Sequence, residues 1–417
     1  MDSLATVPAP ERSGRKGAAP FPPSAPTWKT IRFVQDSVHD FAWFADKRFV
    51  VRKGEVLLPT SGRSVTTWAL STPRNAALWE NAVSYINEAL LHYSRTVGDY
   101  PYAACTAVDG TISAGGGMEY PMITIIGNMT SAESLDNVIA HEVGHNWFQG
   151  ILASNEREHP WLDEGMNSYL ELRYMRARYP HPESAFGIPG EARLMRHFSD
   201  PHRARNELAM RLNTRRDQDQ AASLPSTRFS STNYGTMVYM RTALVMDQLE
   251  ASLGTDLMDR CLHAYFDAWS FRHPGPADLR AVFEQVSGKD LGWVFDELLG
   301  STRKVDVRAR RLKDGVLRYT IRGGSHMPFP VSDTDDPVRR TLWVEPDSTR
   351  RVSLPWPDVD RIRIDAVERT LDIDRRNNGV RANGILRRWT APRLAPFVGL
   401  EREDRVVAGT DALPLIV

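Results

Sequence analysis

The stretch His141-Glu142-Val143-Gly144-His145, followed nineteen residues later by Glu164, constrains this chain more than any other feature. On an α-helix, residues four positions apart lie on the same face, so His141 and His145 can reach one metal ion. Glu142 falls beside them, close enough to polarise a water molecule on that metal. Three protein ligands plus one open position are typical of a catalytic zinc site. The spacing therefore predicts that His141, His145 and Glu164 bind Zn²⁺.

The alternative is an ordinary polar helix face, because the five-residue pattern also occurs by chance in long chains. The flanking residues favour a helix built around a buried site. Thr130, Ser131 and Glu133 offer an N-terminal cap and a first-turn acid. A second helix, predicted over 161–179, carries Glu164 near its start. The apolar residues that surround the two histidines are Val138, Ile139, Val143 and Trp147.

Composition and charge exclude several other classes of protein. The 417 residues include 52 Lys+Arg and 52 Asp+Glu, which removes any global electrostatic argument for binding nucleic acid. Two cysteines, Cys105 and Cys261, are too few for a disulfide framework. No apolar run reaches the roughly 18 residues that span a bilayer. No secretory signal is visible, so the sequence as given predicts the cytoplasm.

Further motifs give the chain a family resemblance. It resembles the gluzincin zinc aminopeptidases, which include aminopeptidase N and puromycin-sensitive aminopeptidase. Their signature is His-Glu-x-x-His, eighteen residues and then Glu, and His141 to Glu164 match it. The stretch 116–120, Gly-Gly-Met-Glu-Tyr, resembles the family's Gly-x-Met-Glu-Asn, with Tyr120 where Asn is usual. The stretch 239–242, Tyr-Met-Arg-Thr, resembles the family's Tyr-x-Lys-Gly.

The resemblance implies a zinc metallo-aminopeptidase that holds one Zn²⁺ per chain and cleaves peptides with a free N-terminus. In that reaction Glu142 is the general base, and Tyr239 donates a hydrogen bond to the developing oxyanion. Glu119 binds the cationic α-amine of the substrate, which interior peptide bonds lack. The substrate-binding residues implied by the resemblance are Gly116, Gly117, Met118 and Glu119.

The expected fold class is α+β, with a mostly helical, thermolysin-like catalytic domain that contains a small sheet. That domain is expected over 61–300, and a small all-β sandwich domain over 301–385. Before them, 28–60 reads as remnant strands of the β domain that normally precedes the catalytic domain in this family. Residues 1–27 form a Pro/Ala-rich leader of disordered composition, and 386–417 stay unassigned. If the chain is N-terminally truncated, a secreted or periplasmic location replaces the cytoplasmic one.

Two alternatives remain open at this stage. One is a zinc endopeptidase of thermolysin type, although such an enzyme has no use for Glu119 as an amine anchor. The other is a truncated zinc-binding paralogue with little activity. The intact Glu142 argues against the second alternative, and the missing N-terminal domain argues for it.

Overall fold

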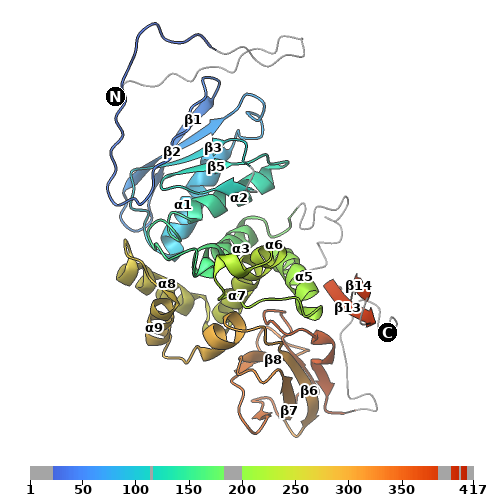
Figure 1. The fold of residues 1–417 in the computed structure, drawn as a ribbon. Helices are drawn as coiled ribbons and strands as arrows, with labels where there is room; N and C mark the ends of the chain where they lie inside the picture. Colours follow the sequence, from blue (N-terminus) through green and yellow to red (C-terminus); the bar gives the residue numbers. More distant parts are fainter. Residues whose placement is uncertain (1–21, 113–115, 183–199, 384–395, 403–404, 411–417) are drawn as a thin grey trace. The chain divides into compact units, whose positions relative to one another are not determined.

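The computed structural model describes residues 22–112, 116–182, 200–383, 396–402 and 405–410 (Figure 1). The chain divides into two compact units. The first comprises Met1–Ser154, Arg173–Met175 and Leu262–Pro274, and the second comprises Asn155–Leu172, Arg176–Cys261 and Gly275–Val417. Helices and small sheets occur in both, which confirms the α+β class.

The first unit is built on one mixed sheet in which the strand order is β1-β2-β3-β5-β4. The β1–β2 and β4–β5 pairs are antiparallel, whereas β2–β3 and β3–β5 are parallel. The short strand β4 lies at the edge, and Glu119 follows it directly. The strands are β1 (Val50–Leu57), β2 (Ser64–Ser71), β3 (Ala104–Asp109), β4 (Gly117–Met118) and β5 (Ile123–Ile126).

The prediction of strands throughout 28–60 is wrong for most of that range. Residues 22–49 contain no strand, and large apolar side chains such as Trp28, Phe33 and Trp43 are exposed there. Only β1 forms, and it pairs with β2 along its whole length. Its hydrogen bonds therefore make β1 the edge strand of the first unit's own sheet, because β2 supplies the partner that an isolated strand lacks.

Two helices of the first unit, α1 (Ala82–Thr96) and α2 (Ala132–Gly144), pack against each other. Helix α2 begins with a reciprocal cap at Ser131, one of the two capping residues that the sequence offers. The Ser131 hydroxyl accepts from the Ser134 amide at 3.1 Å, and the Ser134 hydroxyl accepts from the Ser131 amide at 3.1 Å. Both orphan amides are thereby satisfied, which fixes where the helix starts and hence where His141 lies on it.

The second unit contains a helical part and two antiparallel sheets. Two π-helical segments run directly into α-helices: η1 into α3, and η3 into α7. Such π-helical turns are rare and are found most often at functional sites. The helical segments in or entering this unit are η1 (Trp161–Gly165), α3 (Met166–Arg178), α5 (Pro201–Arg215), η2 (Ser226–Arg228), α6 (Ser231–Asn233), η3 (Tyr234–Arg241), α7 (Thr242–Leu253), α8 (Thr255–Trp269), α9 (Pro276–Ser287), η4 (Trp293–Leu299) and η5 (Arg375–Asn377).

The two sheets are formed by strands that follow residue 300, and they include β8 and β12, which no strand pattern in the sequence predicted. One has the order β10-β7-β6 and the other β12-β11-β8-β9. A further hairpin pairs β13 with β14. The strands are β6 (Asp306–Lys313), β7 (Val316–Arg322), β8 (Phe329–Asp333), β9 (Thr341–Val344), β10 (Arg351–Ser353), β11 (Arg361–Ile364), β12 (Gly379–Arg381), β13 (Pro396–Arg402) and β14 (Arg405–Thr410).

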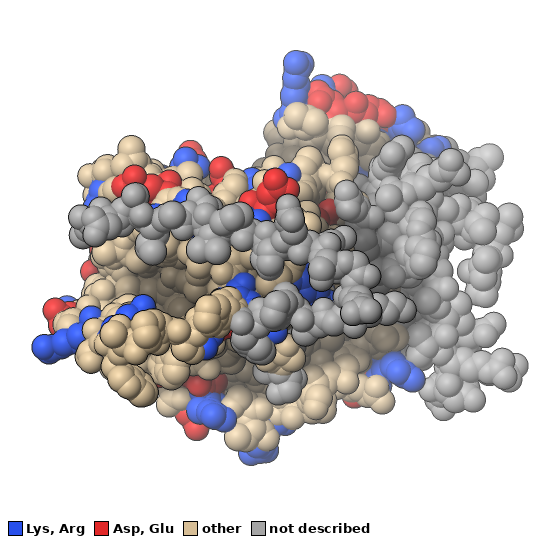
Figure 2. All heavy atoms as spheres, turned by 90° about the horizontal axis from the view of Figure 1, so that it is seen from above, with Lys and Arg blue, Asp and Glu red and all other residues tan. Residues whose placement is uncertain are grey.

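Surface charge agrees with the balanced composition. On the face drawn in Figure 2, basic and acidic side chains are interspersed, and neither sign gathers into a continuous patch. Among the residues that the structure describes, no helix is long and apolar enough to cross a membrane.

The cap of α2 gives a stability prediction. Ser131→Ala removes the acceptor for the Ser134 amide and should lower the free energy of unfolding by about 1 kcal/mol. Urea unfolding followed by tryptophan fluorescence measures this loss. Ser84→Ala, at an exposed position inside α1 of the same unit, is the matched control and should cause no loss, since alanine is the better helix former. Equal losses in both variants would contradict the role of the cap.

Candidate active site

The two histidines of the predicted metal motif face each other at the end of α2. Their Nε2 atoms lie 3.1 Å apart. The buried His145 donates from Nδ1 to the Phe148 carbonyl at 3.0 Å, which leaves the lone pair of its Nε2 available. Two nitrogens bound to one tetrahedral zinc ion are roughly 3.3 Å apart, because each Zn–N bond is about 2.0–2.1 Å. The separation and tautomer therefore fit a shared zinc ion.

Two carboxylates lie beside these rings. Glu119, Glu142 and His145 each offer a ligand atom, and these atoms lie within 4.8 Å of one another. Glu142 is buried within α2, next to His141. The sequence motifs that contain Glu119 and His141–His145 are thus brought together within the first unit, although 22 positions separate Glu119 from His141.

The edge strand β4 passes so close to Glu142 that a side chain at position 117 would force the Glu142 side chain to move. A Cβ atom at Gly117 would lie 2.3 Å from Oε1 of Glu142, far inside van der Waals contact. At Gly116 the nearest atom is Cγ2 of Val138 at 3.4 Å, which is an ordinary contact. Gly117 therefore sets the position of the Glu142 carboxylate. Gly115, the first glycine of the run, lies outside the described residues.

Hydrogen bonds hold the segment that carries Met118 and Glu119. The Thr124 hydroxyl donates to the Met118 carbonyl at 2.9 Å, and the Gly127 amide donates to the Gly116 carbonyl at 2.8 Å. The sequence analysis missed Asn146, which follows the metal motif. Its Oδ1 accepts from the Met122 amide at 2.8 Å and so ties the end of α2 to the turn after Glu119. Nothing in the local pattern of the sequence marks this role.

In the second unit, Tyr239 and Glu164 contact each other directly. The Tyr239 hydroxyl, on η3, donates a hydrogen bond to Oε1 of Glu164, on η1. The ring of Tyr234, on the same segment, lies with its centroid 5.8 Å from that of Tyr239. The structure thus joins the third predicted metal ligand to the residue that the resemblance implies as oxyanion donor.

A glycine permits this approach of η1 to η3. A Cβ atom at Gly165 would lie 2.5 Å from Cγ2 of Thr242 and 2.7 Å from the Val238 carbonyl oxygen. Since Gly165 follows Glu164 and Val238 precedes Tyr239, the contact lies next to the hydrogen bond between their neighbours. The two π-helical segments can come close enough for that bond only because Gly165 has no side chain.

Tyr239 is held in its neutral form. Burial raises the pKa of its phenol above the ordinary value, and the negative charge of Glu164 raises it further. A neutral phenol keeps the proton that it donates in a hydrogen bond. The side chain is therefore a donor throughout the pH range in which proteins stay folded.

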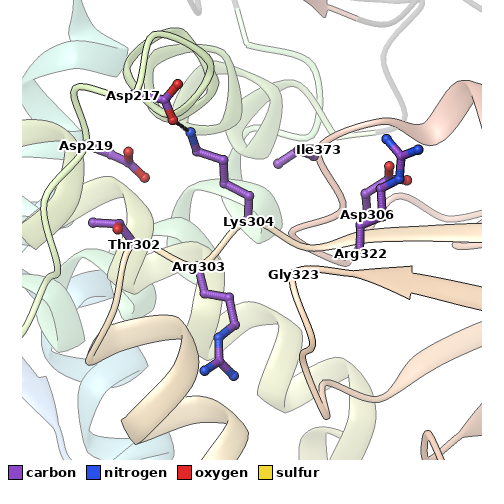
Figure 3. A pocket seen from close by; sticks show the side chains of 9 residues that line it. All are labelled: Asp217, Asp219, Thr302, Arg303, Lys304, Asp306, Arg322, Gly323 and Ile373. Carbon is purple, nitrogen blue, oxygen red and sulfur yellow. Dashed lines mark hydrogen bonds and ion pairs between the residues drawn. The ribbon is translucent and has the colours of Figure 1, made fainter.

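A separate cavity of about 680 Å³ lies in the second unit, and its lining includes neither Glu164 nor Tyr239. Figure 3 shows Lys304 extending toward Asp217, while Arg303 points away from that carboxylate. Three acidic and three basic side chains line the cavity, so its charges balance. The lining residues are Asp217, Asp219, Thr302, Arg303, Lys304, Asp306, Arg322, Gly323 and Ile373.

Comparison with known proteins finds a family model and several relatives that match part of this chain. Residues 99–298 match the model of the peptidase family M1 domain, and that range includes Glu119, Glu142, Glu164 and Tyr239. Leucine aminopeptidase 2 of Aspergillus niger is 26% identical over 181 residues, which are 42% of this chain and 27% of that protein. Leucine aminopeptidase 2 of Neosartorya fischeri is 33% identical over 93 residues, 21% of this chain and 15% of that protein. The matches thus cover about a quarter or less of these relatives.

Among solved structures, aminopeptidase A of Legionella pneumophila in complex with aspartic acid has a similar fold. The alignment covers 73% of this chain and 35% of that chain, with a TM-score of 0.54 and 16% identity. The α+β arrangement of helices and small sheets is therefore one that this chain shares with a solved aminopeptidase structure.

The raised pKa of Tyr239 gives a spectroscopic prediction for the metal-free protein. Between pH 8 and 11 the ultraviolet absorbance of ionising tyrosines should rise equally in wild type and Tyr239→Phe, because Tyr239 stays protonated in that range. In Glu164→Gln the pKa of Tyr239 should fall, since one cause of its rise is removed while burial remains. A smaller rise in Tyr239→Phe than in wild type would contradict this assignment.

Proposed function

We propose that this chain, whose residues 99–298 match the peptidase family M1 domain, is a zinc metallo-aminopeptidase that hydrolyses the N-terminal peptide bond of peptides. The observation that carries the proposal is the grouping of Glu119 with Glu142 and His145. A general base and a metal ligand are common to all peptidases of this chemistry. A further carboxylate beside them is what a substrate with a cationic N-terminus requires.

One zinc ion per chain is proposed, with His141, His145 and Glu164 as its ligands. The Nε2 atoms of His141 and His145 lie close enough to share one ion, and Glu164 is the third ligand that the sequence motif implies. Two imidazoles and one carboxylate are a donor set of catalytic zinc sites. When bound, zinc polarises the scissile carbonyl and lowers the pKa of a water molecule to about 7.

Glu142 is proposed as the general base and acid. Its carboxylate accepts a proton from the attacking water and then delivers that proton to the nitrogen of the leaving amine. Burial in α2 and the close backbone of β4 restrict its position. A base held in one place needs no reorganisation before it accepts the proton.

Glu119 is proposed to bind the α-amine. Near neutral pH that amine carries a positive charge in much of the substrate, and a carboxylate binds it through a charge-assisted hydrogen bond. The bond fixes the first residue of the peptide, so that the first peptide bond meets Glu142. This role argues against a thermolysin-type endopeptidase, whose substrates present no charge at that position.

Tyr239 is proposed to stabilise the transition state. As water attacks, negative charge develops on the carbonyl oxygen, and the phenol donates a hydrogen bond to it. The raised pKa keeps that donor protonated. Before substrate binds, the phenol donates its hydrogen bond to Glu164. It then turns to donate to the carbonyl oxygen of the substrate.

The first functional prediction concerns the substrate's N-terminus. Aminoacyl-p-nitroanilides should be cleaved only with a free amine, and a zinc chelator should abolish the cleavage. Glu119→Ala should raise KM for these substrates at least tenfold, because the ion pair with the amine is lost. Initial rates at 405 nm on free and N-acetylated substrates measure both effects. Glu119→Gln keeps the shape of the side chain and is the matched control. Its KM should lie between the values for wild type and Glu119→Ala.

Each other outcome of that assay contradicts the proposal in its own way. Equal cleavage of the acetylated set would indicate an endopeptidase. Bound zinc without turnover of either set would indicate a zinc-binding paralogue that is inactive.

The second functional prediction concerns the close approach of β4 to Glu142. Gly117→Ala should lower kcat on the order of 100-fold, because the new methyl group displaces the carboxylate of Glu142. Zinc affinity should stay within about threefold, since Glu142 is not one of the proposed zinc ligands. Gly116→Ala is the matched control: its methyl group has room, so kcat should be retained and any change confined to KM. Equal losses of kcat would contradict the positioning of Glu142 by Gly117.

A further inference from the structure

We propose that Asp247 of α7 is a positioning residue for the Glu164–Tyr239 pair, acting through ion pairs with arginines from three separate segments. The inference rests on the proposed function, because it assigns Glu164 to the metal and Tyr239 to the oxyanion. Asp247 itself touches neither substrate nor metal in this proposal. It acts by holding the helices that continue from these two side chains.

Asp247 is fully buried and surrounded by three guanidinium groups. Arg176 of α3 lies 3.0 Å from its Oδ1, and Arg369, from the segment after β11, lies 2.7 Å from the same atom. Arg203 of α5 donates to Oδ2. Burial alone would raise the pKa of Asp247, but the positive charges of Arg203, Arg176 and Arg369 outweigh that effect and lower it. The carboxylate is therefore charged, and each of its two oxygens binds at least one guanidinium group.

These ion pairs form a second tie between the two helices that carry the site. Arg176 lies twelve residues after Glu164 along η1 and α3, and Asp247 lies eight residues after Tyr239 along η3 and α7. At about 1.5 Å per helical residue, the second tie is roughly 12–18 Å from the first along the helix axes. Two ties separated along both helices prevent each helix from rotating or sliding relative to the other.

A further hydrogen bond supports the same register. The Tyr169 hydroxyl, on α3, donates to Oε2 of Glu250, on α7, at 3.0 Å. This bond joins the same two helices as the Arg176–Asp247 ion pair. The Glu164–Tyr239 hydrogen bond is consequently one of several links between η1–α3 and η3–α7.

The third arginine connects α7 to the part of the chain that contains the β-sheets. The Arg369 amide donates to Oδ1 of Asp365 at 2.7 Å, and the Leu371 amide donates to Oε1 of Gln248 at 2.9 Å. Asp365 is in turn bonded to Arg375 at 2.9 Å. The segment 365–375 is thus fixed at both Asp247 and Gln248, so the residues after β11 help to set the position of α7.

The chemistry of the cluster favours a role in positioning. Burying charges costs desolvation free energy, and apolar residues of similar volume often stabilise a protein as well or better. Directional bonds from three guanidinium groups to one carboxylate, however, specify a single arrangement of α3, α5 and α7. An apolar cluster would allow the helices to shift by small amounts, which a metal ligand and an oxyanion donor do not tolerate.

The test is Asp247→Asn, which keeps the shape of the side chain and removes its charge. We expect kcat to fall at least tenfold and the zinc dissociation constant to rise at least tenfold, with KM unchanged within twofold because Glu119 lies on another element. Zinc affinity is measured by competition with a chromophoric chelator. In the metal-free protein, the carbon-13 resonance of the Tyr239 ring, labelled at Cζ and assigned with Tyr239→Phe, should shift.

Asp306→Asn is the matched control. Asp306 of β6 is also buried and paired with an arginine, but the bonds described for it go to Arg308 and Asn377, not to α3 or α7. This variant should lower the unfolding temperature while kcat, zinc affinity and the Tyr239 resonance stay as in wild type. If Asp247→Asn behaves in the same way, Asp247 is only a stability residue and the inference is wrong.

A second variant and a second measurement keep the inference testable. If Asp247→Asn does not fold, Arg176→Met removes a single guanidinium and should change the same quantities in the same direction, by at least threefold in kcat. If wild type shows no zinc-dependent cleavage, the proposed function fails. The resonance of Tyr239 in the metal-free protein then decides the inference alone: a shift in Asp247→Asn but not in Asp306→Asn supports it, and no shift overturns it.

Discussion

The site depends on two places where the backbone passes so close to a neighbouring element that a side chain cannot fit. At Gly117 the neighbour is the side chain of Glu142, and at Gly165 it is the Val238 carbonyl of η3 together with the Thr242 side chain at the start of α7. In each case the missing Cβ is what brings a functional group to its position. Steric contact therefore determines where the Glu142 carboxylate and the Glu164–Tyr239 pair lie. Hydrogen bonds then form within the space that this contact leaves.

Local patterns in the sequence predicted those parts of the structure that local physics determines. Helical spacing placed His141 and His145 on one helix face, and the cap at Ser131 was confirmed because capping needs only residues three apart. Strand β8 was missed, since Phe329–Asp333 is buried at every position and contains Pro330, so it shows no alternation. The roles of His141, His145 and Glu164 as zinc ligands stay predictions.

Interactions between distant segments could not be predicted from the sequence in this way. The three arginines around Asp247 come from positions 176, 203 and 369, and no periodicity links them. The strands expected over 28–49 show the opposite case, in which a local pattern is present but no strand forms. Alternation of apolar residues is there, but the described residues 22–49 form no ladder. A strand needs a partner strand as well as a pattern, and β1 forms where β2 provides one.

The hydrogen bond between Tyr239 and Glu164 shows how one contact can serve two stages of the proposed reaction. A carboxylate has two oxygens, so Glu164 can accept from the phenol at Oε1 and still offer a ligand atom to a metal. When negative charge develops on a substrate oxygen, the phenol exchanges one anionic acceptor for another. The exchange costs little, because a charge-assisted hydrogen bond replaces a bond of the same kind. Without Glu164 as its resting partner, a buried phenol would need another acceptor before substrate arrives, and Asp247 maintains the helix register that keeps this partner within reach.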